Sequence, residues 1–247
     1  MRRPATHPRD RGPGNGPPPN KRLKLPRAVI ALREPQCLRP GGRGLSSTTL
    51  APACGSPAAC ARSVRWQPPS VPAPLTIERC RSTELTDTLA AAVRTLCDAA
   101  YGTATAPFFA SLGSGEHLLG LRKGALVSHL MWVTRWLQPT RQRALRTAYV
   151  EMVATAPSAQ RQGYASALLE HFVTLVGDYE LAALCPATEN LYARLGWRFW
   201  CGPLSARKDG SVVATPDERV MILSLPQTPS LDLDLPLSVE WRRGEIW

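Results

Sequence analysis

The feature that most constrains the fold is an apolar strand followed at once by a glycine-containing loop and an amphipathic helix. The strand is Tyr149-Val-Glu-Met-Val-Ala-Thr155, the loop is Gln160-Arg-Gln-Gly-Tyr-Ala165, and residues 166–176 have a helical pattern. The start of such a helix turns unpaired backbone N–H groups and a positive dipole end toward an anion. Because Glu151 lies on the strand just upstream, the segment predicts an anion cradle beside a base. That is the minimum needed to move a group from a phosphate-bearing carrier to an amine or alcohol.

The helix is predicted from its apolar face. Leu168, Phe172, Leu175 and Val176 recur at helical spacing, so one side of the segment is expected to pack on a sheet. The alternative interpretation is an ordinary strand–loop–helix unit in which Gly163 is only a turn residue.

Charge and proline divide the chain into two parts. Residues 1–75 carry 13 Lys and Arg against 2 Asp and Glu, whereas the remainder carries 17 of each, so the net charge of +11 comes from the first third. That third also holds 15 of the 24 prolines. This composition predicts a disordered basic arm over residues 1–74 and a folded domain over residues 75–247. The basic run 20–27 suits nucleic acid, but a plain arm, or sequence upstream of the true start codon, is the preferred interpretation.

Several classes of protein are excluded by what the chain lacks. It has no run of eighteen apolar residues, which predicts no membrane association. Its seven cysteines include no Cys-x-x-Cys pair, so zinc and thioredoxin-like sites are not expected, and no metal is predicted. Apart from Cys54 and Cys60 of the arm, the cysteines lie in apolar settings and are expected to be reduced core thiols of a cytoplasmic protein; they are Cys37, Cys80, Cys97, Cys185 and Cys201.

The remaining pattern predicts an α+β domain. Strands are expected at 75–80, 117–121, 125–137, 146–155, 180–185, 197–201 and 219–225, and helices at 84–100, from 163 and at 188–195, with a loop or short helix at 101–114. Thr83 is expected to cap the first helix, and Gly196 to end the last. The order βα(α)βββαβαββ predicts a mixed sheet flanked by helices on both faces.

Three motifs resemble one known superfamily. Gln160-x-x-Gly163-x-Ala165 resembles the Arg/Gln-x-x-Gly-x-Gly/Ala signature of the GNAT superfamily of N-acetyltransferases, and Glu189-Asn-Leu-Tyr-Ala-Arg-Leu-Gly-Trp197 is similar to its second signature. The tail Val239-Glu-Trp-Arg-Arg-Gly-Glu-Ile-Trp247 resembles the Asp-Trp-Arg-x-Gly-Asp-Val-Trp terminus of aminoglycoside 2'-N-acetyltransferases. The resemblance covers residues 75–247. It implies a GNAT-like fold, acetyl-CoA as co-substrate, and a role in antibiotic resistance.

Acetyl transfer to an amine needs a base and an acid, because the amine must lose a proton and the leaving thiolate must gain one. Glu151, flanked by valines, is the candidate base, since partial burial would raise its pKa toward a useful range. Tyr192, four residues before Gly196, is the candidate acid, and the resemblance assigns these same roles. The competing interpretations are a Glu151 paired with a cation such as Arg146 and a Tyr192 that is only a core aromatic. His129, which matches a histidine of the family, is expected to be structural.

Acetyl-CoA is expected along the same strand and loop. The backbone groups of Val153 and Thr155 would bond the pantetheine arm like an additional strand. Backbone N–H groups of the loop would hold the pyrophosphate, contributed by Gln160, Arg161, Gln162, Gly163, Tyr164 and Ala165.

The tail supplies the expected acceptor site. Glu245 and the terminal carboxylate of Trp247 would lie on one side of an extended tail and, together with Glu151, attract a cationic amine. The resemblance implies an aminoglycoside in this site.

Three departures from the family pattern bear on the acceptor. The tail has Arg243 where the family has a small residue, and Glu245 where it has aspartate. No acidic residue occurs between Asp98 and Glu116, where the family contributes one. Met152 replaces a small residue beside the candidate base. Losing charge partners for buried ammonium groups costs several kcal/mol.

The sequence therefore predicts an N-acetyltransferase that acts by direct transfer in a ternary complex on a primary amine of a small molecule, an aminoglycoside or aminosugar. The alternatives are transfer to another amine, such as a polyamine, an amino acid or a protein N-terminus, and a non-catalytic acetyl-CoA sensor. Nucleic-acid binding through residues 1–75 is a further alternative, which the neutral remainder disfavours, so no nucleic-acid partner is predicted. A homodimer is left open.

Overall fold

The centre of the molecule is formed by the strands β2 (Glu116–Arg122), β3 (Ala125–Pro139) and β4 (Leu145–Thr155), whose side chains alternate between two apolar cores. The computed structural model describes residues 74–247, so the arm expected at residues 1–74 lies almost wholly outside the described residues. On β3, Leu130 and Trp132 enter one core, while Met131 and Val133 enter the other. Alternation of this kind is what a strand covered on both faces requires.

The remaining elements follow in chain order. They are β1 (Thr76–Arg81), η1 (Ser82–Glu84), α1 (Asp87–Tyr101) and α2 (Ala106–Leu112) before β2, then after β4, η2 (Pro157–Ala159), α3 (Tyr164–Leu175), β5 (Leu181–Leu184), α4 (Glu189–Arg194), β6 (Arg198–Phe199), β7 (Leu204–Lys208), β8 (Ser211–Ala214), β9 (Met221–Ser224) and β10 (Leu237–Glu240). The sheet order is β6-β9-β5-β4-β3-β10-β7-β8, with β1 and β2 paired beside β3. The β4–β5 and β10–β7 pairs are parallel and the others antiparallel.

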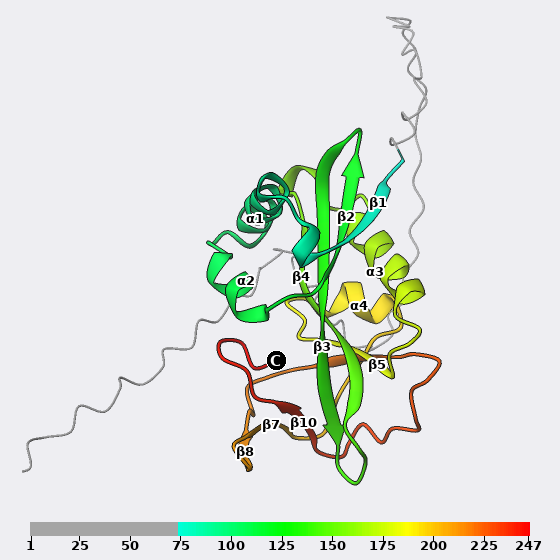
Figure 1. Ribbon diagram of the computed structural model, residues 1–247. Coiled ribbons are helices and arrows are strands. Elements are labelled where there is room, and N and C mark those ends of the chain that lie inside the picture. The colour runs from blue at the N-terminus through cyan, green and yellow to red at the C-terminus, as the bar shows by residue number, and fades with distance from the viewer. Residues whose placement is uncertain (1–73) are drawn as a thin grey trace, which may run out of the picture.

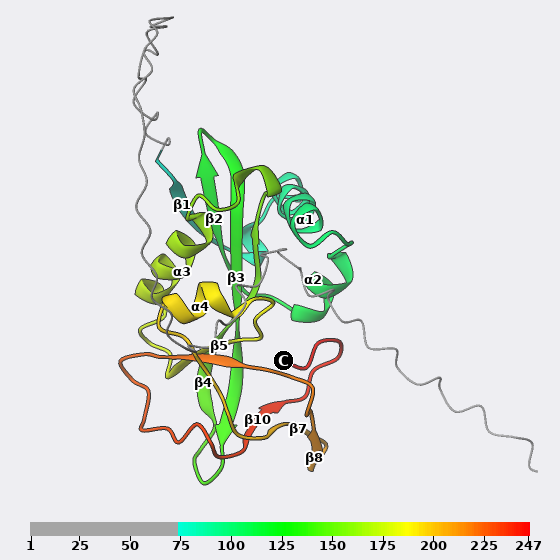
Figure 2. The ribbon, with the colours of Figure 1, turned by 180° about the vertical axis from the view of Figure 1, so that it is seen from behind.

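Helices cover both faces of this sheet, as Figures 1 and 2 show from opposite sides. Val93 and Cys97 of α1 and Phe108 of α2 join the core on one face, whereas Phe172 of α3 and Tyr192 of α4 join the core on the other. The predicted α+β architecture, a mixed sheet with helices on both sides, is confirmed. No helix among residues 74–247 is long and apolar enough to cross a membrane.

Local details of the prediction need correction. Thr83 does not cap α1, because it lies in η1; Thr86 is the cap, and its hydroxyl accepts a hydrogen bond from the Leu89 N–H at 3.2 Å. The strands β7, β8 and β10 were not predicted. The expectation of core thiols holds for Cys97, which is buried, but Cys185 and Cys201 are exposed residues. Cys37 lies outside the described residues.

A bulge distorts β4 beside the candidate base. One residue of β3, Leu130, faces two residues of β4, Met152 and Val153. Met152 adopts φ of 52°, a left-handed backbone conformation that is costly for a residue with a side chain. Tyr149 and Met152 therefore enter the same core although they are three residues apart, whereas a regular strand would place them on opposite faces.

A buried pair of histidines holds the bulge. His129 Nδ1 lies 2.9 Å from the Met152 carbonyl oxygen and must donate to it, so His129 Nε2 accepts from His117 Nδ1, also at 2.9 Å. The other nitrogen of His117 contacts the Ser82 hydroxyl at 2.9 Å. Burial lowers the pKa of His117 to about 4 and that of His129 to about 3. His129 is thus structural, as expected from the sequence.

The histidine pair predicts a loss of stability in mild acid. Both pKa values lie below the unfolded value, so between pH 6.5 and about 4 the unfolded chain binds more protons and stability falls as the pH falls. From pH 7 to pH 5 the expected loss is about 2 kcal/mol for each histidine. Urea unfolding at the two pH values measures this loss. The variant His117→Gln/His129→Asn should be less stable at pH 7 but lose less on acidification. His171→Gln, on the half-buried histidine of α3, should behave as wild type. If the free energy of unfolding fell by the same amount between pH 7 and pH 5 in wild type and in the double variant, the histidine pair would not be the source of the acid sensitivity.

Candidate active site

The predicted site residues gather where β4 and β5 part. The parallel pairing joins residues 147–149 of β4 to residues 181–183 of β5 and goes no further. Glu151 lies two residues after Tyr149, the last residue of β4 that pairs with β5, and the bulge at Met152 follows directly. The backbone of β4 beyond residue 150 is therefore unpaired on its β5 side, which is where an extended ligand could lie.

Glu151 is a largely buried carboxylate with one strong partner. Its Oε1 accepts a hydrogen bond of 2.6 Å from Arg242 Nη2, and the side chains of Glu151 and Arg242 are 14% and 12% exposed. Burial raises the pKa of Glu151, and the Arg242 guanidinium opposes that rise. The competing sequence interpretation of a paired carboxylate was therefore right in kind but not in partner. Arg146 binds Asp178 at 2.8 Å and stacks on the Tyr179 ring.

Tyr192 lies on α4 and belongs to the apolar core on the α3–α4 face of the sheet. Its ring meets Trp197 edge to face at 6.1 Å, and burial raises the pKa of its hydroxyl, so it stays protonated at neutral pH. Among the described residues no hydrogen bond to this hydroxyl is found. Gly196, with φ of 86°, follows the helix as predicted and turns the chain toward Trp197.

Tyr101, the last residue of α1, was missed by the sequence reasoning, although it contacts the strand that carries Glu151. Its hydroxyl donates to the Val153 carbonyl at 2.9 Å. Burial raises the pKa of Tyr101, so its hydroxyl is protonated at neutral pH. The available signal was its spacing, because Tyr101 continues the buried positions Val93 and Cys97 of α1 at intervals of four residues.

Cys185, just beyond β5, lies in the same region and was expected in the core. Although Cys185 is exposed as a residue, the protein around its sulfur atom reduces the hydration of a thiolate, and together with nearby carboxylates this raises the pKa of the thiol to about 12, so it is a thiol rather than a thiolate at neutral pH. The carboxylates that raise this pKa are those of Glu151, Glu218 and Glu245, and Cys185 in turn contributes to the raised pKa of Tyr192. A direct attack by the acceptor amine needs no contribution from this thiol.

Of the two strand positions predicted to bond pantetheine, Thr155 faces the open side of β4. Ala156 N–H donates to Val127 on β3, so by alternation Thr155 turns its backbone groups away from β3, whereas Val153 lies in the bulge, where the alternation is interrupted. Their carbonyls have side-chain partners, the Tyr101 hydroxyl and Gln160 Nε2 at 3.3 Å.

The predicted phosphate loop leads directly into α3. Gly163 is the N-cap with φ of 83°, and no side chain caps the helix, so the first N–H groups have no side-chain acceptor. Arg161 is exposed and also has a left-handed backbone, with φ of 61°. Gln162 accepts from Arg122 Nη1 at 3.2 Å and from the Tyr164 hydroxyl at 3.0 Å. Arg122, on the β2–β3 hairpin, is a cation beside the loop that sequence spacing could not place there. Ala165 lies in the first turn of α3.

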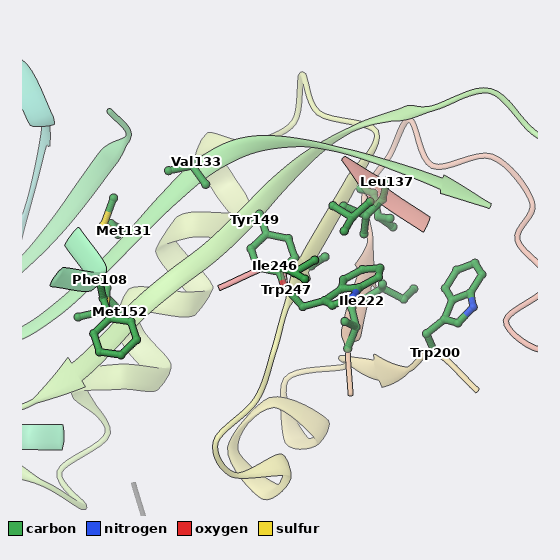
Figure 3. Close-up of a cluster of buried hydrophobic side chains, with 14 of the residues drawn as sticks. Phe108, Met131, Val133, Leu137, Tyr149, Met152, Trp200, Ile222, Ile246 and Trp247 are labelled. Atoms are coloured by element: carbon green, nitrogen blue, oxygen red, sulfur yellow. The ribbon is translucent and has the colours of Figure 1, made fainter. Parts of the chain in front are cut away.

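The tail folds back onto the sheet, as its apolar residues predicted. Trp247 is 3% exposed, and its Nε1 donates to the Thr215 hydroxyl at 2.8 Å. Ile246 is buried, and its carbonyl accepts from Arg135 Nη1 at 3.0 Å. Figure 3 shows Ile246 and Trp247 beside Tyr149. The condition for placing Glu245 and the terminal carboxylate on one side, an extended tail, is not met, because the chain turns at Gly244.

Gly244 is needed for this path. It has φ of 91°, and a Cβ atom at this position would lie 2.9 Å from the Ser111 Cβ atom on α2. Between α2 and the tail lies a hollow of about 360 Å³. It is lined by Pro107, Phe108, Ala110, Ser111, Arg243, Gly244 and Glu245. One carboxylate, one guanidinium and one hydroxyl therefore border the hollow.

The arrangement combines the parts that acyl transfer to an amine requires. A strand edge and an uncapped helix start lie along one path, and a buried carboxylate and a protonated phenol lie near its end. The hollow beside the tail connects to the carboxylate through Arg242, whose Nε donates to the Glu245 carbonyl. These contacts join the predicted base to the tail, and the predicted acid lies on α4, which follows β5 in the chain.

Comparisons with known proteins agree with this chemistry. An acetyltransferase (GNAT) domain model matches residues 82–200. Over 140 residues the chain is 34% identical to an aminoglycoside 2'-N-acetyltransferase from Mycolicibacterium fortuitum, covering 54% of this chain and 71% of that protein.

Two solved structures are also similar. Eis1 from Mycobacterium abscessus has a TM-score of 0.45 at 20% identity, covering 53% of this chain but only 32% of Eis1, so the chain spans about a third of that protein. The GNAT-family N-acetyltransferase YhbS from Escherichia coli, in complex with CoA, has a TM-score of 0.46 at 14% identity, covering 71% of this chain and 93% of YhbS. With a matching domain model and a 34%-identical relative covered over 71% of its length, the chain belongs to the GNAT superfamily and is an N-acetyltransferase.

Proposed function

We propose that this enzyme transfers the acetyl group of acetyl-CoA to a primary amine of a small molecule, and that the acceptor is an aminoglycoside or a related aminosugar. The observation that carries the proposal is the buried carboxylate of Glu151, which lies where the β4–β5 pairing ends. Arg242 donates hydrogen bonds both to this carboxylate and to the Glu245 carbonyl of the tail, and the tail lines the hollow. The relative from Mycolicibacterium fortuitum supports the acceptor class. Under this proposal the protein acts in the cytoplasm and confers resistance to aminoglycosides.

Acetyl-CoA would lie along the open side of β4. Its pantetheine would bond the backbone at Val153 and Thr155, and its pyrophosphate would meet the N–H groups at the start of α3, from residues 160 to 165. Arg122 and Arg161 would add positive charge beside the phosphates. The thioester would then reach the region between Glu151 and Tyr192.

Transfer is direct in the proposed mechanism. The neutral amine nitrogen attacks the thioester carbonyl, the new C–N bond forms, and the C–S bond breaks. Glu151 takes the amine proton, directly or through a water molecule, and the Tyr192 hydroxyl gives its proton to the departing thiolate. Holding the two substrates together supplies much of the acceleration.

The acceptor would occupy the hollow between α2 and the tail. Glu245, Trp247 and Glu151 are the proposed acceptor-binding residues; Glu245 lines the hollow, and Arg242 links Glu151 to the same tail. A second candidate acceptor is a different amine, such as a polyamine, an amino acid or a protein N-terminus. Arg243 favours it, because this exposed cation lines the same hollow and repels a polycationic acceptor.

Thiol release from acetyl-CoA tests both candidates. The full 247-residue chain is assayed with a 2'-amino aminoglycoside, a polyamine, an amino acid and a short peptide, and acetyl-CoA binding is measured separately by calorimetry. We expect turnover with the aminoglycoside. Turnover only with another class would move the assignment to the second candidate. Tight acetyl-CoA binding with no turnover on any amine would contradict both and support a non-catalytic sensor.

A further inference from the structure

The side chain of Arg242, in the tail, forms an ion pair with the candidate base Glu151. Arg242 Nη2 donates to Glu151 Oε1 at 2.6 Å across 91 positions of sequence, and both side chains are nearly buried. No hydrogen bond to Glu151 Oε2 is found among the described residues. One carboxylate oxygen is therefore fixed by the tail, and the other has no competing protein donor.

The same guanidinium also holds the tail. Its Nε donates to the Glu245 carbonyl, so one side chain joins the base to the segment that lines the acceptor hollow. Its Nη1 is buried with no partner among the described residues, as is the Tyr149 hydroxyl. A buried guanidinium with an unmet N–H is costly, and such a cost is retained where the charge has a use.

Resting on the proposed function, we infer that Arg242 is the positioning residue of Glu151: its guanidinium holds one carboxylate oxygen and leaves the other for the acceptor, so the docked tail sets the orientation of the base.

The charge balance around Glu151 supports this role. The titratable groups that face it come from the tail, β3, β4, α1 and the end of β5, and they are Arg242, Arg135, Tyr149, Tyr101 and Cys185. Tyr149, Tyr101 and Cys185 are uncharged at neutral pH. Arg135 is already engaged by Glu240 at 2.5 Å. Arg242 is therefore the main charge that offsets the burial of the carboxylate.

Two variants separate positioning from simple support of the fold. Arg242→Met removes the charge and keeps the length, whereas Arg242→Lys keeps the charge. The rate of acetyl transfer is measured against pH, with the melting temperature recorded for each variant. In Arg242→Met we expect the acidic limb of the turnover–pH profile to shift to higher pH by at least about one unit, because the carboxyl group of Glu151 loses its positive partner. The loss of rate should therefore be largest at low pH. Arg242→Lys should keep the limb within a few tenths of a unit of wild type.

A residue that only supports the fold would give a different result. Both variants would then lose rate by the same factor at every pH, and that outcome overturns the inference. An Arg242→Met limb that coincides with the wild-type limb also overturns it.

A readout without turnover keeps this test independent of the proposed acceptor. The Glu151 carboxyl is followed by ¹³C NMR titration, assigned by its absence in Glu151→Gln. A higher pKa in Arg242→Met than in wild type supports the inference, and an unchanged pKa overturns it. If wild type acetylates no amine, the proposed function fails while this titration still decides the role of Arg242.

Discussion

Replacing Glu151 by glutamine is expected to lower the turnover of acetyl transfer at least about 100-fold, the usual loss when a general base is removed. The amide keeps the shape of the carboxylate and can still accept the Arg242 hydrogen bond, but it cannot take the amine proton. The acetyl-CoA affinity should stay within about twofold, because the proposed cofactor contacts on β4 are backbone groups. Steady-state kinetics for turnover and calorimetry for acetyl-CoA binding measure the two effects.

Glu240 offers a matched control for this variant. It is also a glutamate bound to an arginine, since its carboxylate accepts from Arg135 at 2.5 Å, but it lies on β10 away from the β4–β5 gap. Glu240→Gln should keep most of the turnover. If both variants lose activity by the same factor, or Glu151→Gln loses less than about tenfold, Glu151 is not the base.

Replacing Tyr192 by phenylalanine is expected to lower turnover by about 100-fold while leaving acetyl-CoA affinity almost intact. Burial raises the pKa of this phenol, so it enters the reaction protonated and can donate to the thiolate as the C–S bond breaks. Phenylalanine preserves the edge-to-face contact with Trp197 and removes only the hydroxyl. The same pair of measurements, turnover and binding, gives the effect.

Tyr179 is the matched control for Tyr192. Both residues are 8% exposed and belong to the same apolar core. Tyr179 lies just before the start of β5, and its hydroxyl forms a hydrogen bond of 2.8 Å with the Thr134 hydroxyl. Tyr179→Phe should lower the melting temperature without a matching loss of turnover. Equal turnover in Tyr192→Phe and wild type would remove Tyr192 from the mechanism.

The sequence predicted most of the fold that carries the site. The long strands and α3 repeat their apolar residues over enough positions to be recognised, and Gly163 and Gly196 mark turns that need a left-handed backbone. The order of elements up to β6 follows from these signals. Candidate residues Glu151 and Tyr192 could be predicted because each sits in a motif with fixed spacing.

The missed strands differ in the local signal that they leave. The strands β7 and β8 form a hairpin whose turn is Asp209-Gly210, with φ of 49° and 76°, and this dipeptide is a strong hairpin signal that was overlooked. The four exposed residues of β8 gave no buried alternation to support it. The strand β10 is four residues long and pairs with Pro139, Gln138 and Leu137, about 100 positions earlier in the chain, so it depends on a distant partner that a local pattern does not record.

The partners within the site were unpredictable for a related reason. The ion pair between Arg242 and Glu151 depends on the turn at Gly244 and on the docking of Trp247, whereas the sequence-based placement assumed an extended tail. The bond from His129 to the Met152 carbonyl depends on a bulge, which needs the register of two strands.

Two aminoglycosides that differ only in bearing an amino or a hydroxyl group at the 2' position decide whether the proposed function holds. Each is incubated with the enzyme and acetyl-CoA, and the products are examined by mass spectrometry and NMR. We predict one added acetyl group on the 2' nitrogen of the first compound and no product from the second. Acetylation of both compounds at another amine, or of neither while a different class of amine reacts, would contradict the proposed function.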